Sequence, residues 1–216
     1  TTTIKNDTSD DKWIVFVSSK EDGQAIENEI GEASVFIQSE TIHPELDLII
    51  NESRFSRKVL IATKTLDNGI NIKDDKVKNI VIMAWDKITF IQMLGRRRVN
   101  IEDADTVNLY IRLRDSRSFN TWLKVYSDKL EKIKLCTENI NEFCREYDNN
   151  LIGIAKYGDL FFKDKDTNEW TINPLGEMRV NTDIKFAEYM IQKFKDEGKY
   201  AFIKEQLSWI GLEGTF

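Results

Sequence analysis

Residues 58–72 read Lys-Val-Leu-Ile-Ala-Thr-Lys-Thr-Leu-Asp-Asn-Gly-Ile-Asn-Ile, and residues 90–99 read Phe-Ile-Gln-Met-Leu-Gly-Arg-Arg-Arg-Val. The first stretch predicts a buried strand over Val59–Ala62 that runs into a polar turn. A strand over Ile80–Trp85 and a short helix over Thr89–Leu94 then lead to three adjacent arginines. Arginine carries a permanent charge and fork-shaped donors that suit phosphate oxygens. Because open α/β sheets bind ligands at the carboxyl ends of their strands, we expect the arginines to lie at that edge.

Strand and helix patterns also alternate on the amino-terminal side of this stretch. Apolar runs predict strands at Ile14–Val17 and Ser34–Gln38, with an amphipathic helix over Glu21–Glu32 between them. A second helix is expected to begin near Pro44, where the missing N–H costs nothing. This alternation implies an α/β fold, a RecA-like parallel sheet with right-handed crossovers and helices on both faces. Residues 1–11 lack periodicity and are expected to be a flexible lead-in.

The sheet is expected to end with an exposed strand inside 105–113, which closes an α/β domain over residues 1–114. Residues 115–216 are expected to be an accessory helical region with a β-hairpin. Apolar positions at three-four spacing from Phe119 to Tyr147 predict one long amphipathic helix, or a helix broken once. The hairpin is expected around 160–172, followed by helices at about 183–197 and 200–210.

Composition limits the possible classes of protein. The 216 residues are 41% hydrophobic and contain no apolar run of membrane-spanning length, so no membrane partner is expected. A net charge of −6 argues against a stand-alone DNA-binding module. Cys136 and Cys144 are better explained as core residues of a protein in a reducing, cytoplasmic setting than as a disulfide. The single histidine, His43, has no cysteine or histidine cluster around it, so no metal site is expected.

Three motifs carry a resemblance to a known family. Ala62-Thr63 through Gly69-Ile70-Asn71-Ile72 resembles motif V of the superfamily 2 helicases, usually A-T-x-x-x-x-x-G-I-D-I. Gln92-x-x-Gly95-Arg96 resembles motif VI, Q-x-x-G-R-x-x-R, and residues 13–20 resemble motif IV. The order and spacing of these motifs over roughly residues 12–114 are similar to the second, C-terminal RecA-like domain of the DEAD/DEAH-type nucleic-acid-dependent ATPases.

The resemblance implies roles for particular residues. An arginine finger for the γ-phosphate of ATP is implied among Arg96, Arg97 and Arg98, with Gln92 orienting the attacking water or holding the nucleotide. Nucleotide contacts are implied for Gly69, Asn71 and Gly95. Contacts to a nucleic-acid backbone, with DNA favoured over RNA, are implied for Thr63, Lys64, Ser18 and Ser19.

Two positions depart from the family pattern. The second arginine of motif VI would fall at position 99, which is Val99, whereas Arg98 lies one residue earlier. Asn71 replaces the usual aspartate of motif V. It keeps an acceptor for a ribose hydroxyl but carries no charge.

Much of the ATPase machinery is missing from the sequence. It contains neither G-x-x-x-x-G-K-[ST] nor a D-E-x-D or D-E-x-H stretch, and Glu197-Gly198-Lys199-Tyr200 lacks the upstream glycine and the hydroxyl. The resemblance therefore implies that ATP and Mg²⁺ are bound mainly by an N-terminal RecA-like ATPase domain of the same polypeptide. We expect this chain to be inactive by itself.

The same residues are also compatible with purely structural roles. The arginines could be a solvated helix end, where cations suit the helix dipole. Thr63 and Asn71 could brace turns, and Ser18 and Ser19 could be a strand end and a helix cap. The alternative function is a non-catalytic α/β interaction module. A stand-alone nucleotide-binding domain is disfavoured, because no glycine-rich loop opens the first helix.

Overall fold

The computed structural model describes residues 1–38, 42–63, 70–98 and 106–214. The chain divides into two compact units, Thr1–Leu113 with Ile203–Phe216, and Arg114–Phe202. The C-terminal segment therefore belongs with the sheet rather than with the accessory region in which the sequence places it. Two contacts show why. The Phe90 and Trp209 rings lie 5.5 Å apart, and Gln206 Nε2 donates to the Ala84 carbonyl at 3.5 Å.

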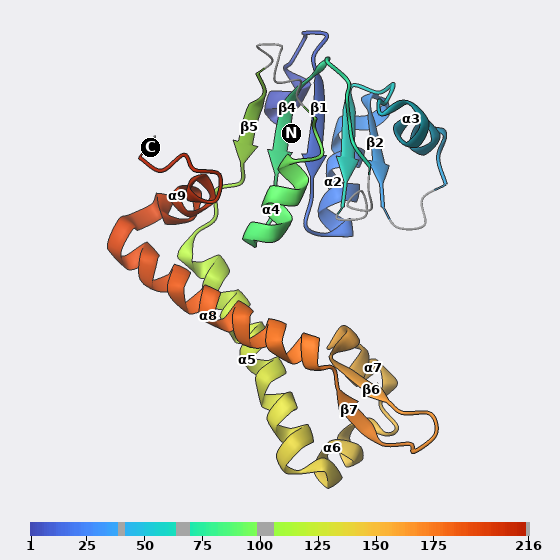
Figure 1. The fold of residues 1–216 in the computed structure, drawn as a ribbon, viewed down its shortest axis with the longest axis vertical. Coiled ribbons are helices and arrows are strands. Elements are labelled where there is room, and N and C mark those ends of the chain that lie inside the picture. The colour runs from blue at the N-terminus through green and yellow to red at the C-terminus, as the bar shows by residue number, and fades with distance from the viewer. Residues whose placement is uncertain (39–41, 64–69, 99–105, 215–216) are drawn as a thin grey trace. The chain divides into compact units, whose positions relative to one another are not determined.

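The first unit is built on a five-stranded parallel sheet in the order β2-β3-β1-β4-β5, with helices on both faces (Figure 1). Its strands are β1 Lys12–Phe16, β2 Ser34–Ile37, β3 Val59–Ala62, β4 Val77–Ile82 and β5 Asn108–Ile111. Its helices are α1 Thr2–Lys5, α2 Lys20–Ile30, α3 Pro44–Glu52 and α4 Lys87–Leu94, and α9 Ala201–Ser208 reaches into it. The predicted α/β fold is confirmed.

Register and burial explain the position of each strand. Ile14 of β1 pairs with Leu60 of β3 on one side and Ile80 of β4 on the other, and all three are at most 1% exposed. Strands buried on both faces read as continuous apolar runs, which is why the sequence reveals them. The edge strand β5 alternates exposed and half-buried residues, as predicted. Strand β4 begins at Val77 and ends at Ile82, three residues earlier at each end than the apolar run suggests.

The expected flexible lead-in at residues 1–11 is wrong. Ile4 of α1 is 7% exposed and belongs to a core with Trp13, Val15 and Val17, which all point to one face of β1. The Asp7 carboxylate accepts from Trp13 Nε1 at 2.6 Å and from the backbone N–H of Ser9 at 2.9 Å. One buried isoleucine and one hydrogen-bonded carboxylate therefore attach this segment to the sheet, and neither produces a periodic pattern.

Asp7 should make stability depend on acid pH. Hydrogen bonds from Ser9 and Trp13, with a smaller contribution from Lys58, hold the pKa of Asp7 well below its ordinary 3.8. The unfolded chain takes up this proton more readily, so the stabilisation is present above pH 3.8 and is lost as the pH falls below it. We expect Asp7→Asn to lower the free energy of unfolding by about 1–3 kcal/mol at neutral pH. In urea unfolding the difference should shrink progressively as the pH is lowered below 3.8, and most of it should still be present at pH 3, because the folded-state pKa of Asp7 lies well below that pH.

Asp10→Asn is the matched control, because Asp10 is exposed and its carboxylate forms no hydrogen bond or ion pair with a described residue. Equal losses for both variants at neutral pH would contradict the assignment.

The second unit has its own core. Its helices are α5 Ser116–Glu138, α6 Ile140–Tyr147, α7 Leu151–Ala155 and α8 Pro174–Glu197. Its antiparallel hairpin pairs β6 Phe161–Lys163 with β7 Trp170–Ile172. Short 3₁₀ helices of this unit lie at Gly158–Leu160 and Gly198–Tyr200. The first unit has a 3₁₀ helix at Gly31–Ala33. The Phe119 ring meets the rings of Phe186, Phe194 and Phe202 at 5.0–6.2 Å. Aromatic packing of this kind pairs α5 with α8.

Two expectations for this unit meet different outcomes. The helix broken once is confirmed, because Asn139 ends α5 with φ −142° and its side chain caps α6. Helix α8 begins nine residues before its expected start. Asn173 and Pro174 do not simply close the hairpin, since the Asn173 side chain accepts from Leu175 N at 3.1 Å and Pro174 occupies the first turn of α8.

In the described ranges, no helix has the length and apolar character needed to cross a bilayer. Cys136 and Cys144 are both free thiols.

Candidate functional site

The segments that resemble motifs V and VI are hydrogen-bonded to each other. Ile72 N donates to the Arg96 carbonyl at 2.8 Å, and Arg98 N donates to the Ile72 carbonyl at 2.9 Å. These two bonds make a parallel bridge between Ile72 and Arg97. Arg98 Nε also donates to Asn71 Oδ1 at 2.9 Å, and Arg96 Nη1 lies 3.4 Å from the Ile70 carbonyl. Residues about 25 positions apart in sequence are thus brought into one group.

The three arginines have different environments. The Arg97 side chain is 1% exposed, and its Nε donates to the Val77 carbonyl at 3.2 Å, with Nη2 4.0 Å from Asp75. The Arg97 guanidinium is thus enclosed and hydrogen-bonded within its own unit, where it braces the fold. Arg98 is exposed, and among the described residues only Asn71 accepts from its guanidinium. No other described residue accepts from its two terminal nitrogens. Arg96 is half-buried between these extremes.

The expected position of the arginines at the carboxyl ends of the strands is wrong. Helix α4 starts after β4 has ended at Ile82 and carries the chain back along the sheet, over about 12 Å for eight residues (Figure 1). The bond from Arg97 to Val77, the first residue of β4, places the arginines at the amino end of that strand. Thr63 follows Ala62, the last residue of β3, and lies at the opposite, carboxyl edge.

The carboxyl edge holds the residues expected to contact nucleic acid. Thr63 is half-buried, and its backbone N–H donates to the Ile37 carbonyl at 3.4 Å. The Ser18 hydroxyl donates to the Met83 carbonyl, so it ties β1 to the end of β4. Ser19 Oγ accepts from Asp22 N at 3.0 Å and caps α2. The structural role of both serines is confirmed.

Helix α4 presents Gln92 on an exposed surface. Asp86 caps the helix by accepting from Thr89 N at 2.9 Å, and Phe90 and Met93 are buried beneath it. Gln92 lies on the solvent side, beside the exposed Ile88 and Ile91.

Gly95 ends α4, and its N–H donates to Ile91 O at 2.9 Å. An added Cβ at Gly95 would lie 3.3 Å from that same oxygen, so a small residue suits this turn. Gly69 and Lys64, which the resemblance also assigns to ligands, lie outside the described residues.

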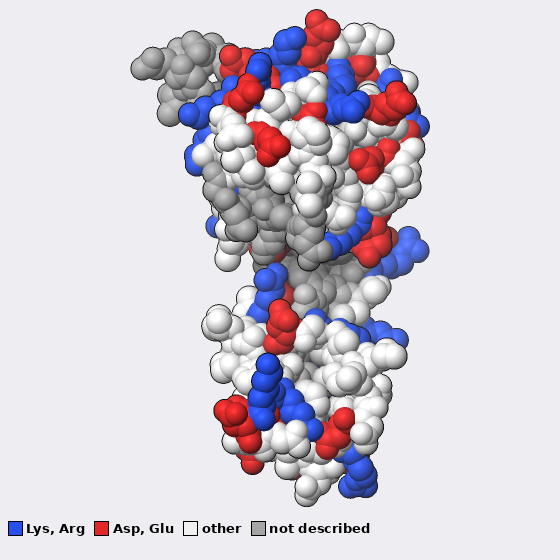
Figure 2. Space-filling view, turned by 90° about the vertical axis from the view of Figure 1, so that its right-hand side faces the viewer, with Lys and Arg blue, Asp and Glu red and all other residues white. Residues whose placement is uncertain are grey.

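One face of the molecule carries side chains of both charges. On the face drawn in Figure 2, lysine and arginine side chains are interspersed with aspartate and glutamate. Within the described ranges, no group of three or more His, Cys, Asp or Glu side chains could hold a metal ion.

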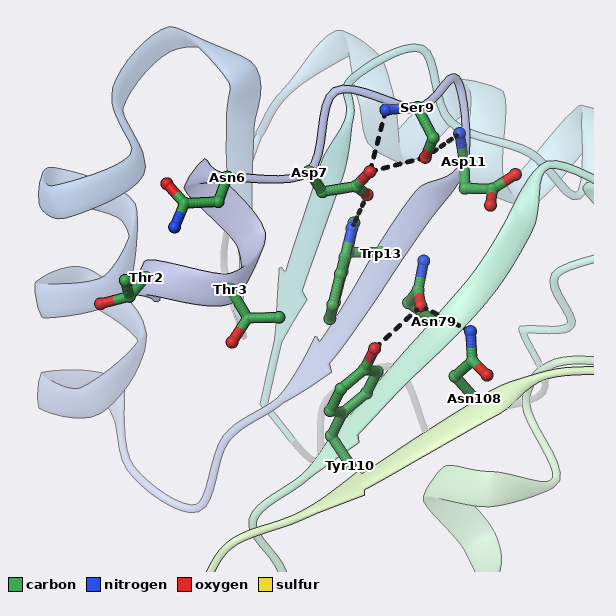
Figure 3. A pocket seen from close by; sticks show the side chains of 10 residues that line it. All are labelled: Thr2, Thr3, Asn6, Asp7, Ser9, Asp11, Trp13, Asn79, Asn108 and Tyr110. Carbon is green, nitrogen blue, oxygen red and sulfur yellow. Dashed lines mark hydrogen bonds between the residues drawn. The ribbon is translucent and has the colours of Figure 1, made fainter.

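The sequence did not reveal a cavity of about 540 Å³ on the first unit (Figure 3). It is bounded by α1, the loop after it, and the strands β1, β4 and β5, with Trp13 and Tyr110 as its aromatic wall. Asn79 is its most informative polar residue, because an amide in the middle of an apolar strand is 4% exposed there. That interruption of the strand was the only available signal in the sequence.

Comparisons with known proteins agree with the motif assignment. Residues 2–100 match the family model of the helicase conserved C-terminal domain. No match was found among curated protein sequences. Similar solved structures include the Escherichia coli DEAD-box protein SrmB bound to regulator of ribonuclease activity A, at 20% identity and TM-score 0.39, over 50% of this chain and 65% of that one.

Two further solved structures are similar in part. Saccharomyces cerevisiae Dbp5 bound to RNA and ADP BeF3 is 23% identical, with TM-score 0.39, over 52% of this chain and 30% of that chain. The C-terminal part of the Fun30 ATPase domain is 11% identical, with TM-score 0.38, over 83% of this chain and 48% of that chain. This chain thus spans less than two-thirds of each of the three. Residues 2–100 of this chain match the helicase conserved C-terminal domain, and the resemblance seen in motifs IV, V and VI is confirmed.

Proposed function

We propose that this chain is the C-terminal motor half of an ATP-dependent nucleic-acid helicase or translocase. ATP and Mg²⁺ would be held mainly by an N-terminal RecA-like domain of the same polypeptide. Asn71, Gln92 and Arg98, with Arg96 beside them, would meet that nucleotide from the amino edge of the sheet. Thr63 would contact the nucleic-acid backbone at the carboxyl edge.

The hydrogen bond from Arg98 Nε to Asn71 Oδ1 is the observation that carries the nucleotide role. It holds the guanidinium in one orientation and leaves two charged donors exposed, which is the arrangement a transition-state phosphate needs from an arginine finger. The neutral Asn71 would accept from a ribose hydroxyl with its remaining lone pair. Arg98 is therefore the first candidate for the finger, although the motif itself points to Arg96.

The two edges suit two ligands at once. Strands of four to six residues separate Thr63 from the arginines by roughly 13–20 Å. A nucleotide at one edge and a nucleic-acid strand at the other would not compete for space. The proposal names nucleic acid without choosing DNA or RNA, because hydroxyl contacts to phosphate oxygens are common to both.

The nucleic-acid role of Thr63 predicts a modest, uniform loss of affinity. Thr63→Val keeps the shape of the side chain but removes its hydroxyl, so single-stranded nucleic acid should bind the full-length protein about two- to tenfold more weakly. Every sequence should be affected alike, because the contact is to the backbone. The salt dependence should not change, since a neutral hydroxyl releases no counterion. Fluorescence anisotropy at several salt concentrations measures both quantities.

Thr121→Val is the control for that experiment. Thr121 is an exposed threonine of α5 whose hydroxyl donates to the Arg117 carbonyl within its own helix. Equal affinities for the wild type and Thr63→Val would remove Thr63 from the proposed interface.

The isolated chain offers a direct test of the division of labour. We expect the purified 216 residues to hydrolyse ATP negligibly, because the sequence holds no phosphate-cradling loop and no magnesium carboxylate motif. Steady-state phosphate release, with and without single-stranded nucleic acid, measures this. Robust turnover by the chain alone would contradict the proposal.

A further inference from the structure

The cavity of Figure 3 is distinct from the nucleotide group and the nucleic-acid edge. It holds about 540 Å³, within the range of small-molecule sites. None of the arginines, Asn71, Gln92 or Thr63 lines it. Its walls come from four elements, α1, β1, β4 and β5, so the fold builds it from parts far apart in sequence.

The aromatic wall of the cavity provides a stacking surface. Tyr110 is 37% exposed, and its ring lies 4.9 Å from that of Trp13, tilted by 36°. Trp13 is 2% exposed and is fixed by its hydrogen bond to Asp7. One face of the pair is thus rigid and buried, and the Tyr110 ring is left partly open. A planar heteroaromatic ring gains most from such a surface.

The polar wall offers both a donor and an acceptor. Asn79 Oδ1 accepts from Asn108 Nδ2 at 3.1 Å and lies 3.4 Å from the Tyr110 hydroxyl. These bonds fix the amide, and Asn79 Nδ2 donates to no described residue, although Asn79 is 4% exposed. The Nδ2 group can therefore donate to an oxygen or nitrogen of a ligand in the cavity. The Asp11 carboxylate likewise has no partner among the described side chains.

Charge at the cavity disfavours a phosphate group. Of the ten residues that line it, none is lysine or arginine, and two are aspartates, Asp7 and Asp11. Asp7 is neutralised by Lys58, 3.3 Å away, but Asp11 keeps its charge open. A ligand with a dianionic group would be repelled, whereas hydroxyls and amino groups would find an acceptor.

We propose that this cavity binds an uncharged nucleoside, with its base against Tyr110 and its polar groups hydrogen-bonded to Asn79 and Asp11. The ligand class follows from the combination of a stacking ring, a fixed amide donor and an unpaired carboxylate without cations. The proposal does not rest on the motor role, and failure of either leaves the other standing.

Calorimetric titration of the full chain with adenosine, adenosine monophosphate and ribose tests this directly. Adenosine should bind one to one with a dissociation constant of about 0.1 mM, the value implied by usual affinities per atom for a ligand of this size. The monophosphate should bind about five- to tenfold more weakly, because its charge meets Asp11. Ribose should give no measurable heat, since it lacks the base.

Substitutions separate stacking from charge. Tyr110→Leu should weaken adenosine binding about tenfold, and Tyr110→Phe, which keeps the ring, should change it by less than about twofold. Asp11→Asn should abolish the preference for adenosine over its monophosphate. Tyr200→Leu is the matched control, because Tyr200 is 36% exposed and does not line the cavity. Thermal melts of every variant check that the fold is intact.

Three results would overturn the proposal. They are the absence of binding heat at millimolar adenosine, equal affinities for ribose and adenosine, and unchanged adenosine affinity in a folded Tyr110→Leu protein. If Tyr110→Leu fails to fold, Asp11→Asn decides the question, because Asp11 lies in the loop before β1 and its carboxylate contacts no described residue.

Discussion

Replacing Arg98 by alanine in the full-length protein is expected to lower ATP turnover by about 10³–10⁵-fold while leaving ATP binding largely intact. The physical reason is that an arginine finger acts on charge that develops only in the transition state. Arg98 has the required donors, since its Nε is held by Asn71 and its terminal nitrogens are exposed. Steady-state turnover and nucleotide affinity, measured on the same preparation, separate the two effects.

Arg96→Ala and Asn71→Ala make this experiment more informative. Loss of turnover in Arg98→Ala, with a smaller loss in Arg96→Ala, would assign the finger to Arg98, and the reverse order would assign it to Arg96. Asn71→Ala removes the acceptor that orients Arg98, so it should reduce turnover by a smaller factor. Arg54→Ala is the control, because Arg54 is an exposed arginine of the same unit whose ion pair is with Glu52.

An unaffected turnover rate in both Arg96→Ala and Arg98→Ala would defeat the motor assignment. It would favour the alternative that the sequence left open, a non-catalytic interaction module built on a helicase-like sheet.

Phe119→Ala is expected to destabilise the second unit by about 3–5 kcal/mol. Phe119 is 0% exposed, and its ring contacts Trp122, Phe186 and Phe202 at centroid distances of 5.0–6.2 Å. Truncation would leave a cavity between α5 and α8 that the surrounding rings cannot fill without moving. Hydrogen exchange should show the loss of protection in the amides of these two helices.

The same measurement tests whether the two cores are independent. The amides of β1, β3 and β4 belong to a different core and should keep their protection. Phe162→Ala is the matched control, since Phe162 is 48% exposed in the same unit and its removal creates no cavity. A loss of protection confined to the sheet, or equal losses in both variants, would contradict the packing described here.

Prediction from sequence succeeded where one element produces its own pattern. The runs that became β1, β2 and β3 were found because strands buried on both faces are continuously apolar. The break in the long helix was allowed for, and the free cysteines and the edge character of β5 were expected. Prediction failed where a single contact decides the outcome. Ile4 and Asp7 attach the first residues to the sheet, and Asn173 begins a helix where its neighbours suggest a turn.

The site shows the same division between local pattern and fold. By itself the sequence identified the match of residues 2–100 to the helicase conserved C-terminal domain, through motifs IV, V and VI, and supplied the candidate residues. It could not distinguish three adjacent arginines, because adjacent side chains point in different directions and only packing decides which is enclosed. Tertiary structure buried Arg97, exposed Arg98 beside Asn71, and placed both at the edge opposite Thr63. That placement depends on α4 running back along the sheet after β4, and no single stretch of sequence contains both partners of those contacts.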